Sequence, residues 1–130
     1  MQIDVSQESA AVPVTVLRPS GAIRSEEGLE LVAQQEIEAG ARHILVDLSD
    51  VPYMATSGLR ALHSIYESLR QVAPDATDDA VRKGISAGSY YSPHLKLLKP
   101  SKNTMETLRT AGYDMFLEIF QDRKKALASF

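Results

Sequence analysis

Hydrophobic positions change their spacing several times along the chain, and the changes predict strands that alternate with helices. The run V-P-V-T-V-L-R over residues 12–18 is rich in β-branched residues and ends at Pro19-Ser20-Gly21, which predicts a strand followed by a turn. Pro13 is expected near the start of this strand or on a sheet edge. Residues 2–5 can form a shorter strand before it. The almost continuously apolar run H-I-L-V-D-L over residues 43–48 is typical of a strand that is covered on both faces.

Two amphipathic helices are predicted, one before and one after that apolar strand in the sequence. The first is expected to be capped by Ser25, with Glu26 and Glu27 at its positive end and Gly40 just past its last turn. The second follows Gly58 and carries an apolar stripe at helical spacing. The stripe comprises Leu59, Leu62, Ile65, Tyr66 and Leu69. This spacing predicts that the stripe faces the core.

The remaining segments predict two further strands, each followed by a helix. The strands are expected over residues 95–99 and 115–120. A helix opened by Ser101 or Asn103 should lie between them, and Asp122 should cap a final helix. Regular alternation of this kind indicates an α/β domain with a mostly parallel sheet.

Composition narrows the classes of protein to which the chain can belong. Its 130 residues fit one domain spanning 1–130. The absence of cysteine excludes disulfides and thiol chemistry and fits a cytoplasmic protein. No apolar run reaches the roughly 18 residues that a membrane span needs. A net charge of −3, with scattered basic residues, argues against general binding of nucleic acid.

One long connection, over residues 71–93, interrupts the alternation. It is rich in Pro, Gly, Ser, Asp and Ala, and connections of this length are uncommon inside compact domains. Two interpretations stay open. The segment is either a mobile loop or a contact for a specific partner, in which case Tyr90 and Tyr91 are the best anchors.

The sequence contains no pattern typical of an enzyme. Neither of the two glycine-rich phosphate-binding fingerprints occurs, and Ser57 does not lie in a G-x-S-x-G elbow. The three histidines, His43, His63 and His94, lie in separate elements without the spacing of metal ligands. Asp47 and Asp50 are close in sequence, but Asp50 is better interpreted as a residue that stabilises a turn. We therefore expect no catalytic residue, metal or cofactor.

The stretch Ala55-Thr56-Ser57-Gly58 stands between a buried strand and an amphipathic helix. At least one of its hydroxyls is expected to cap the helix. A phosphoryl group would also be tolerated there, because the helix dipole and free N–H groups favour negative charge. Phosphorylation would add about −1.5 to −2 charges without unfolding the domain. The position is therefore suited to a switch, although these considerations do not require one.

The sequence D-L-S-D-V-P-Y-M-A-T-S-G-L, between the apolar strand and the second helix, resembles the central signature of the STAS domain family. The resemblance extends to V-T-V-L-R-P-S-G, H-I-L-V-D-L-S-D-V, H-L-K-L-L-K-P and T-L-R-T-A-G-Y-D-M-F-L-E-I-F. It implies a small α/β domain with a mixed, mostly parallel sheet and about four helices packed largely on one side. It also implies a protein without catalytic activity, of the anti-sigma factor antagonist type.

Such antagonists are partner-switching regulators of transcription in bacteria. The resemblance implies an anti-sigma factor with Ser/Thr kinase activity as one partner and a PP2C-type phosphatase as another, and a homodimer stays open. The phosphorylated residue would be Thr56, with Ser57 as the alternative. The implied partner-binding surface comprises Arg24, Asp50, Thr56, Ser57, Gly58, Arg60 and His63.

Two positions differ from the family pattern. Ala55 replaces the acid that often precedes the acceptor, and Arg24 follows Gly21-Ala22-Ile23 where an acid is common. Arg24 is therefore a candidate to pair with a phosphate or another anion near Thr56. These differences also leave an alternative function open. The chain could be an unphosphorylated STAS module that senses a small anion or other ligand, or that serves as an accessory subunit of a membrane transporter.

Overall fold

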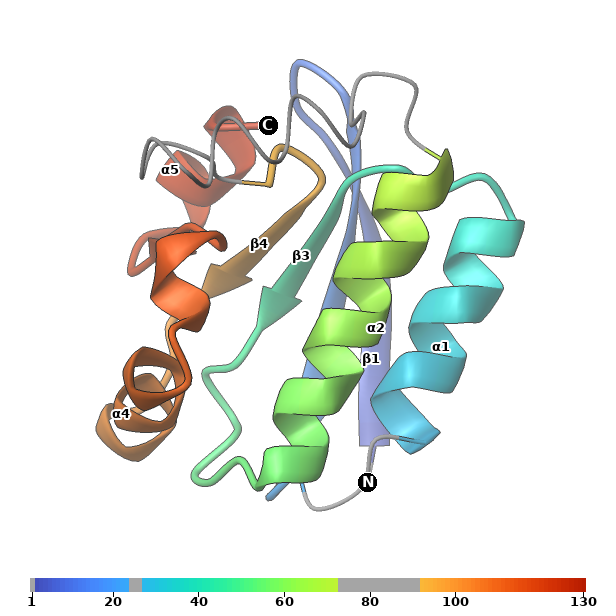
Figure 1. The fold of residues 1–130 in the computed structure, drawn as a ribbon. Coiled ribbons are helices and arrows are strands. Elements are labelled where there is room, and N and C mark those ends of the chain that lie inside the picture. Colours follow the sequence, from blue (N-terminus) through green and yellow to red (C-terminus); the bar gives the residue numbers. More distant parts are fainter. Residues whose placement is uncertain (1, 24–26, 73–91) are drawn as a thin grey trace.

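A five-stranded mixed sheet forms the centre of the fold, in the strand order β1-β2-β3-β4-β5. The computed structural model describes residues 2–23, 27–72 and 92–130. The strands are β1 (Gln2–Ser9), β2 (Pro13–Ser20), β3 (Ile44–Asp47), β4 (Leu95–Leu98) and β5 (Ile119–Phe120). β1 pairs with β2 in antiparallel fashion, and the other three pairings are parallel. The predicted α/β class with a mostly parallel sheet is confirmed (Figure 1).

The described helices cover both faces of the sheet unequally. They are α1 (Glu27–Glu38), α2 (Thr56–Val72), α4 (Lys102–Thr110), α5 (Arg123–Ala128) and a short 3₁₀ turn, η1 (Tyr113–Met115). Figure 1 shows α1 and α2 side by side across one face of the sheet. The larger core lies under these two helices and includes Leu17, Ile44, Val46, Leu95 and Leu97 from the sheet. A smaller core on the other face joins Val14, Val16, Leu45 and Leu98 to Ala126 of α5.

The predicted apolar stripe of α2 is buried along its whole length. Its five members are at most 9% exposed, and Leu62 and Ile65 are completely buried. β3 is buried at all four positions, as expected for a strand covered on both faces. Two predicted caps are also confirmed. Ser101 accepts a hydrogen bond from the Thr104 N–H (3.2 Å), and Asp122 accepts one from the Lys125 N–H (3.2 Å).

The two sheet edges differ from the sequence prediction. The first strand continues to Ser9 instead of ending near residue 5, because β1 pairs with all eight residues of β2 as a long hairpin. Pro13 begins β2, where its missing N–H costs no ladder hydrogen bond. The last strand was predicted over residues 115–120 but contains only Ile119 and Phe120. Tyr113–Met115 forms η1 instead, after Gly112, whose φ of 80° ends the preceding helical turn.

Three predictions fall on residues outside the described part of the chain. They are the Ser25 cap, the anion-pairing role of Arg24, and the role of most of the 71–93 segment, including Tyr90 and Tyr91. Within that segment Gln71 and Val72 belong to α2, and Ser92 is buried just before β4.

Candidate functional site

The segment that leads into α2 is tied to the segment that follows β2. Ile23 and Met54 form a parallel bridge. The Ile23 N–H donates to the Tyr53 carbonyl (3.0 Å), and the Ala55 N–H donates to the Ile23 carbonyl (2.9 Å). Further back, the Gly21 N–H donates to the Asp50 carbonyl (3.0 Å). The start of α2 is therefore fixed by backbone hydrogen bonds between residues 29 to 32 positions apart in the sequence.

The α2 helix begins at Thr56, so the prediction that Thr56 or Ser57 caps it is wrong. Ala55 holds the cap position, and its carbonyl accepts hydrogen bonds from the N–H groups of Gly58 (2.9 Å) and Leu59 (3.3 Å). Thr56 is exposed and Ser57 is half-buried. Neither hydroxyl makes a hydrogen bond to the described residues. Both side chains are therefore free of a capping role, and that of Thr56 is open to solvent.

Gly58 lies where α2 comes closest to the bridge below it. It is buried, and a Cβ atom added there would stand 2.5 Å from Met54 Cγ and 2.8 Å from Ile23 Cγ2. Both distances are too short for real Cβ contacts. Gly58 therefore allows the first turn of α2 to pack directly onto Ile23 and Met54. Its predicted role in partner binding remains a prediction.

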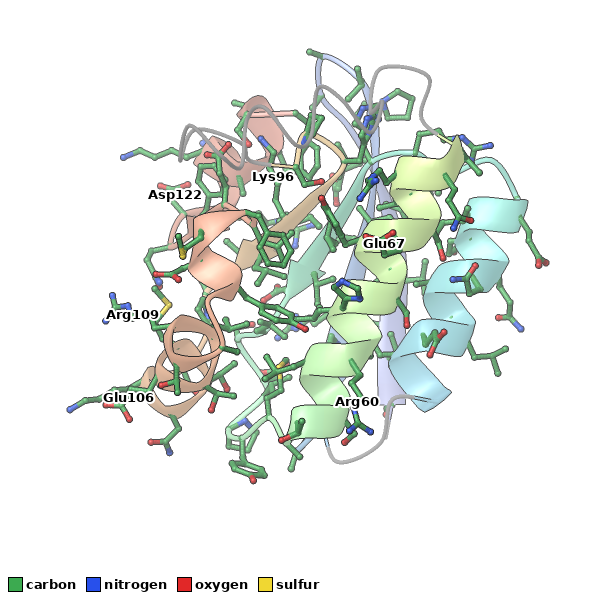
Figure 2. The ribbon with its side chains drawn as sticks, viewed as in Figure 1. Arg60, Glu67, Lys96, Glu106, Arg109 and Asp122 are labelled. Atoms are coloured by element: carbon green, nitrogen blue, oxygen red, sulfur yellow. The ribbon has the colours of Figure 1, made fainter. Side chains whose placement is uncertain are left out.

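Arg60 and His63, which the family resemblance places on the partner-binding surface, are exposed on α2. His63 Nε2 lies 4.0 Å from Glu67 Oε1, one helical turn further on. Figure 2 shows Arg60 near the start of α2 and Glu67 further along the same helix. The outer surface of α2 next to Thr56 thus carries charged and titratable groups that a partner could contact.

Asp50 has a different local role from the one predicted. Its carboxylate pairs with Arg18 (2.7 Å) at an exposed position, where such pairs contribute at most about 1 kcal/mol. The turn is instead stabilised by Asp47, whose Oδ1 accepts the Ser49 N–H (3.0 Å). Asp47 is buried and so cannot offer its carboxylate to a partner. The exposed Arg18–Asp50 pair belongs to the same end of the sheet as Thr56.

An open groove of about 650 Å³ lies between the start of α2 and α4. Thr56, Tyr53 and Leu59 line one wall. The other wall comes from α4 and the residue after it: Asn103, Glu106, Thr107, Thr110 and Ala111. Tyr53 is 50% exposed, which is unusual for a large aromatic side chain. Sequence reasoning missed this groove, and the one available signal was the aromatic Tyr53 just before the Thr56 stretch.

A partly buried hydrogen bond joins the first turn of α2 to η1. The Tyr113 hydroxyl donates to the Leu59 carbonyl (3.0 Å). Its ring also packs against Phe116, which in turn packs against Tyr66 of α2. Burial raises the pKa of the Tyr113 phenol above its ordinary value of 10.0, because desolvation penalises the phenolate. The neutral phenol therefore connects η1, which follows α4, to the first turn of α2.

Replacing Tyr113 with Phe is expected to lower the free energy of unfolding by about 1 kcal/mol at neutral pH, because one hydrogen bond is lost. The raised pKa also gives the wild type a pH dependence. The native state holds its phenolic proton more tightly than the unfolded state, so this contribution is complete below about pH 10 and decreases as the pH rises through the folded pKa. Urea unfolding from pH 8 to 11 would measure both effects.

Tyr53→Phe is the matched control, because its hydroxyl makes no hydrogen bond to the described residues. Its stability should follow that of the wild type at every pH. The stability gap between wild type and Tyr113→Phe should narrow above pH 10. A gap that widens there would show that the phenol is not the group held neutral in the native state.

No metal centre or membrane-spanning helix is found in the described ranges. These residues contain no group of three His, Cys, Asp or Glu side chains arranged to hold a metal ion. Within the same ranges, no helix is both long and apolar enough to cross a bilayer. His43 and His94 do come together, with ring centroids 5.0 Å apart, and His94 Nδ1 lies 2.9 Å from the Arg42 carbonyl. The His43 ring also meets the Phe130 ring edge to face, with centroids 5.9 Å apart.

Comparison with known proteins identifies related domains. The family model of the STAS domain matches residues 5–74, which are 70 of the 130 residues. No curated protein matches the sequence. An anti-sigma factor antagonist from Mycobacterium paratuberculosis has a similar structure, with a TM-score of 0.69 and 18% identity over 98% of this chain and 93% of the other.

Two structures of SpoIIAA are also similar. The phosphorylated form of this Bacillus cell fate determinant gives a TM-score of 0.63 and 16% identity, covering 96% of each chain. The unphosphorylated form, described as an anti-sigma factor antagonist, gives 0.59 and 12% over 96% of this chain and 93% of the other. At these identities the similarity establishes the shared fold.

Proposed function

The chain belongs to the STAS domain family, and we propose that it is a partner-switching regulator of the anti-sigma factor antagonist type. In this proposal the unmodified chain binds an anti-sigma factor with kinase activity and has no catalytic activity of its own. Phosphorylation of Thr56 weakens that binding, and a PP2C-type phosphatase reverses it. The observation that carries the proposal is the exposed Thr56 hydroxyl in the first turn of α2, at the position that matches the family's acceptor.

The surroundings of Thr56 support a phosphate there. α2 has 17 residues and no acidic side chain in its first turn, so its N-terminal partial positive charge is not already neutralised by a carboxylate. A phosphate at this end would be compensated by the dipole and by N–H groups of the first turn. Because Thr56 is exposed and makes no hydrogen bond to the described residues, its modification would break no internal contact.

The groove beside Thr56 supports a binding switch. Thr56 shares the groove with exposed Tyr53 and with Glu106 of α4, and Figure 2 shows Glu106 and Arg109 on that helix. Addition of about two negative charges at Thr56 would change both the shape and the charge of this surface. A partner that docks against Tyr53 and α4 would therefore distinguish the two forms without a change of fold.

Phosphosite mapping on protein isolated from its native cells tests the switch directly. We expect intact mass to show one added phosphate that disappears after phosphatase treatment and that maps to Thr56. Thr56→Ala should abolish the modification, whereas the matched Ser57→Ala should retain it. Phosphate on Ser57 in the wild type would move the assignment by one residue.

Copurification from the same cells tests the partner. We expect the wild type and Thr56→Ala to retain a kinase of the anti-sigma type, and Thr56→Glu to bind it at least tenfold more weakly. If no phosphate is found in any growth condition and no such kinase copurifies, the proposal is wrong. Copurification with a transporter ATPase would then favour the accessory-subunit function.

A further inference from the structure

A second cavity lies at the opposite end of the sheet strands from Thr56 (Figure 1). It has a volume of about 470 Å³, within the range of small-ligand sites. Its walls are the β1–β2 hairpin, the last turn of α1 and the segment that leads into β3. The lining residues are Gln7, Val12, Pro13, Thr15, Glu36, Ala39, Gly40, Ala41, Arg42 and His43. In Figure 1 the end of α1 lies at the top of the view and the start of α2 at the bottom, so the two sites are well separated.

Two opposite charges line this cavity without pairing with each other. Glu36, on α1, and Arg42 are both half-buried. Glu36 forms no ion pair with the described residues. Arg42 uses Nη1 to donate to the carbonyls of Ile37 (3.0 Å) and Ala41 (2.8 Å). Its Nη2 and Nε have no hydrogen-bond partner among the described residues. A half-buried carboxylate and guanidinium that remain apart can each serve a ligand group of opposite charge.

Neighbouring polar groups add further donors and acceptors. The Thr15 hydroxyl donates to Gln7 Oε1 (2.9 Å), which fixes the amide so that its NH₂ group remains available as a donor. The carbonyls of Ala39 and Gly40 follow the last turn of α1, and no described residue donates to them. The cavity therefore offers donors from Gln7 and Arg42 and acceptors from Glu36 and from these carbonyls.

We propose that this cavity binds a small zwitterion, namely an α-amino acid with an aliphatic side chain. Its carboxylate would bind Arg42 and the Gln7 amide, and its ammonium would bind Glu36 and the free carbonyls after α1. Its side chain would contact the apolar wall of Val12, Pro13 and Ala41. Binding in this cavity is independent of the proposed switch, because the cavity shares no residue with the groove beside Thr56.

Titration of the purified, ¹⁵N-labelled chain with L-leucine tests this proposal. We expect saturable shifts of the backbone amides of Gln7 and of residues 39–43. 4-Methylpentanoate, which lacks the ammonium, and isopentylamine, which lacks the carboxylate, should each bind at least tenfold more weakly, because each forfeits one charge-assisted contact. Glu36→Gln should weaken the binding of L-leucine by a similar factor.

Two further variants separate binding from folding. Glu38→Gln removes an exposed charge from the same helix outside the cavity and should leave the affinity unchanged. Ala39→Leu adds bulk at the cavity wall without a change of charge and should also weaken binding, while its melting temperature stays near that of the wild type. The absence of saturable shifts up to about 10 mM L-leucine, or equal binding of 4-methylpentanoate, would overturn the proposal.

Discussion

Replacing Gly58 with Ala is expected to lower the free energy of unfolding by about 2–3 kcal/mol, which is near the upper limit for overpacking by one methyl group. The added Cβ would lie 2.5 Å from Met54 Cγ and 2.8 Å from Ile23 Cγ2. Both neighbours are buried and joined by the parallel bridge, so neither can move away at low cost. Urea unfolding should show a lower midpoint with an unchanged slope.

Gly28→Ala is the matched control, because a Cβ at that position of α1 would meet nothing within 4 Å. There the usual preference of helices for alanine should leave the stability unchanged or raise it by up to about 1 kcal/mol. The difference between the two variants isolates the close approach at Gly58. Equal stabilities would mean that α2 can shift away from the bridge, and the geometry proposed for Thr56 would lose its support.

Much of the fold could be predicted from the sequence because its signals are local. The apolar stripe of α2 follows directly from helical spacing, and all its members are buried. Ser101 and Asp122 act as caps because their oxygens reach N–H groups three residues further along the chain. The continuous apolar run of β3 likewise predicts a strand that is covered on both faces.

The predictions that proved wrong or incomplete concern features that depend on residues far away in the sequence. The second half of β1 is mostly exposed and shows no clear hydrophobic period, so its strand is defined by pairing with β2. The start of α2 was misplaced because Ala55 is positioned by the backbone of Ile23 and not by a capping side chain. The groove beside Thr56 joins Tyr53 to Glu106 on a helix that follows much later, and no spacing along the chain reveals such a neighbour.

The burial of Lys96 is another feature that no sequence pattern predicted. It lies in β4 on the side of the sheet covered by α5, and it is only 4% exposed. Its ammonium donates to the carbonyl and hydroxyl of Ser129 (both 3.0 Å) and lies 3.4 Å from Glu118 Oε1. It also lies 5.1 Å from the centre of the Phe130 ring. One buried side chain thus joins the sheet to the C-terminal end of α5.

Lys96→Ala is expected to lower the free energy of unfolding by about 3 kcal/mol. The variant removes a buried four-carbon stem as well as the ammonium, so a cavity adds to the lost hydrogen bonds. Because α5 packs on the smaller core through Ala126, we expect the loss to appear first as faster hydrogen exchange in residues 123–129. Urea unfolding and amide exchange measure the two effects separately.

Lys96→Met distinguishes the stem from the charge. Methionine retains most of the buried volume, and its sulfur can contact the rings of Phe120 and Phe130. The groups that contact the ammonium would not be left buried without a partner, because Ser129 is exposed and the Glu118 side chain is 40% exposed. The substitution also removes the cost of burying a charge. We therefore expect Lys96→Met to lose no more than about 1 kcal/mol. A loss as large as that of Lys96→Ala would instead show that the ammonium network, and not packing of the stem, holds α5 on the sheet.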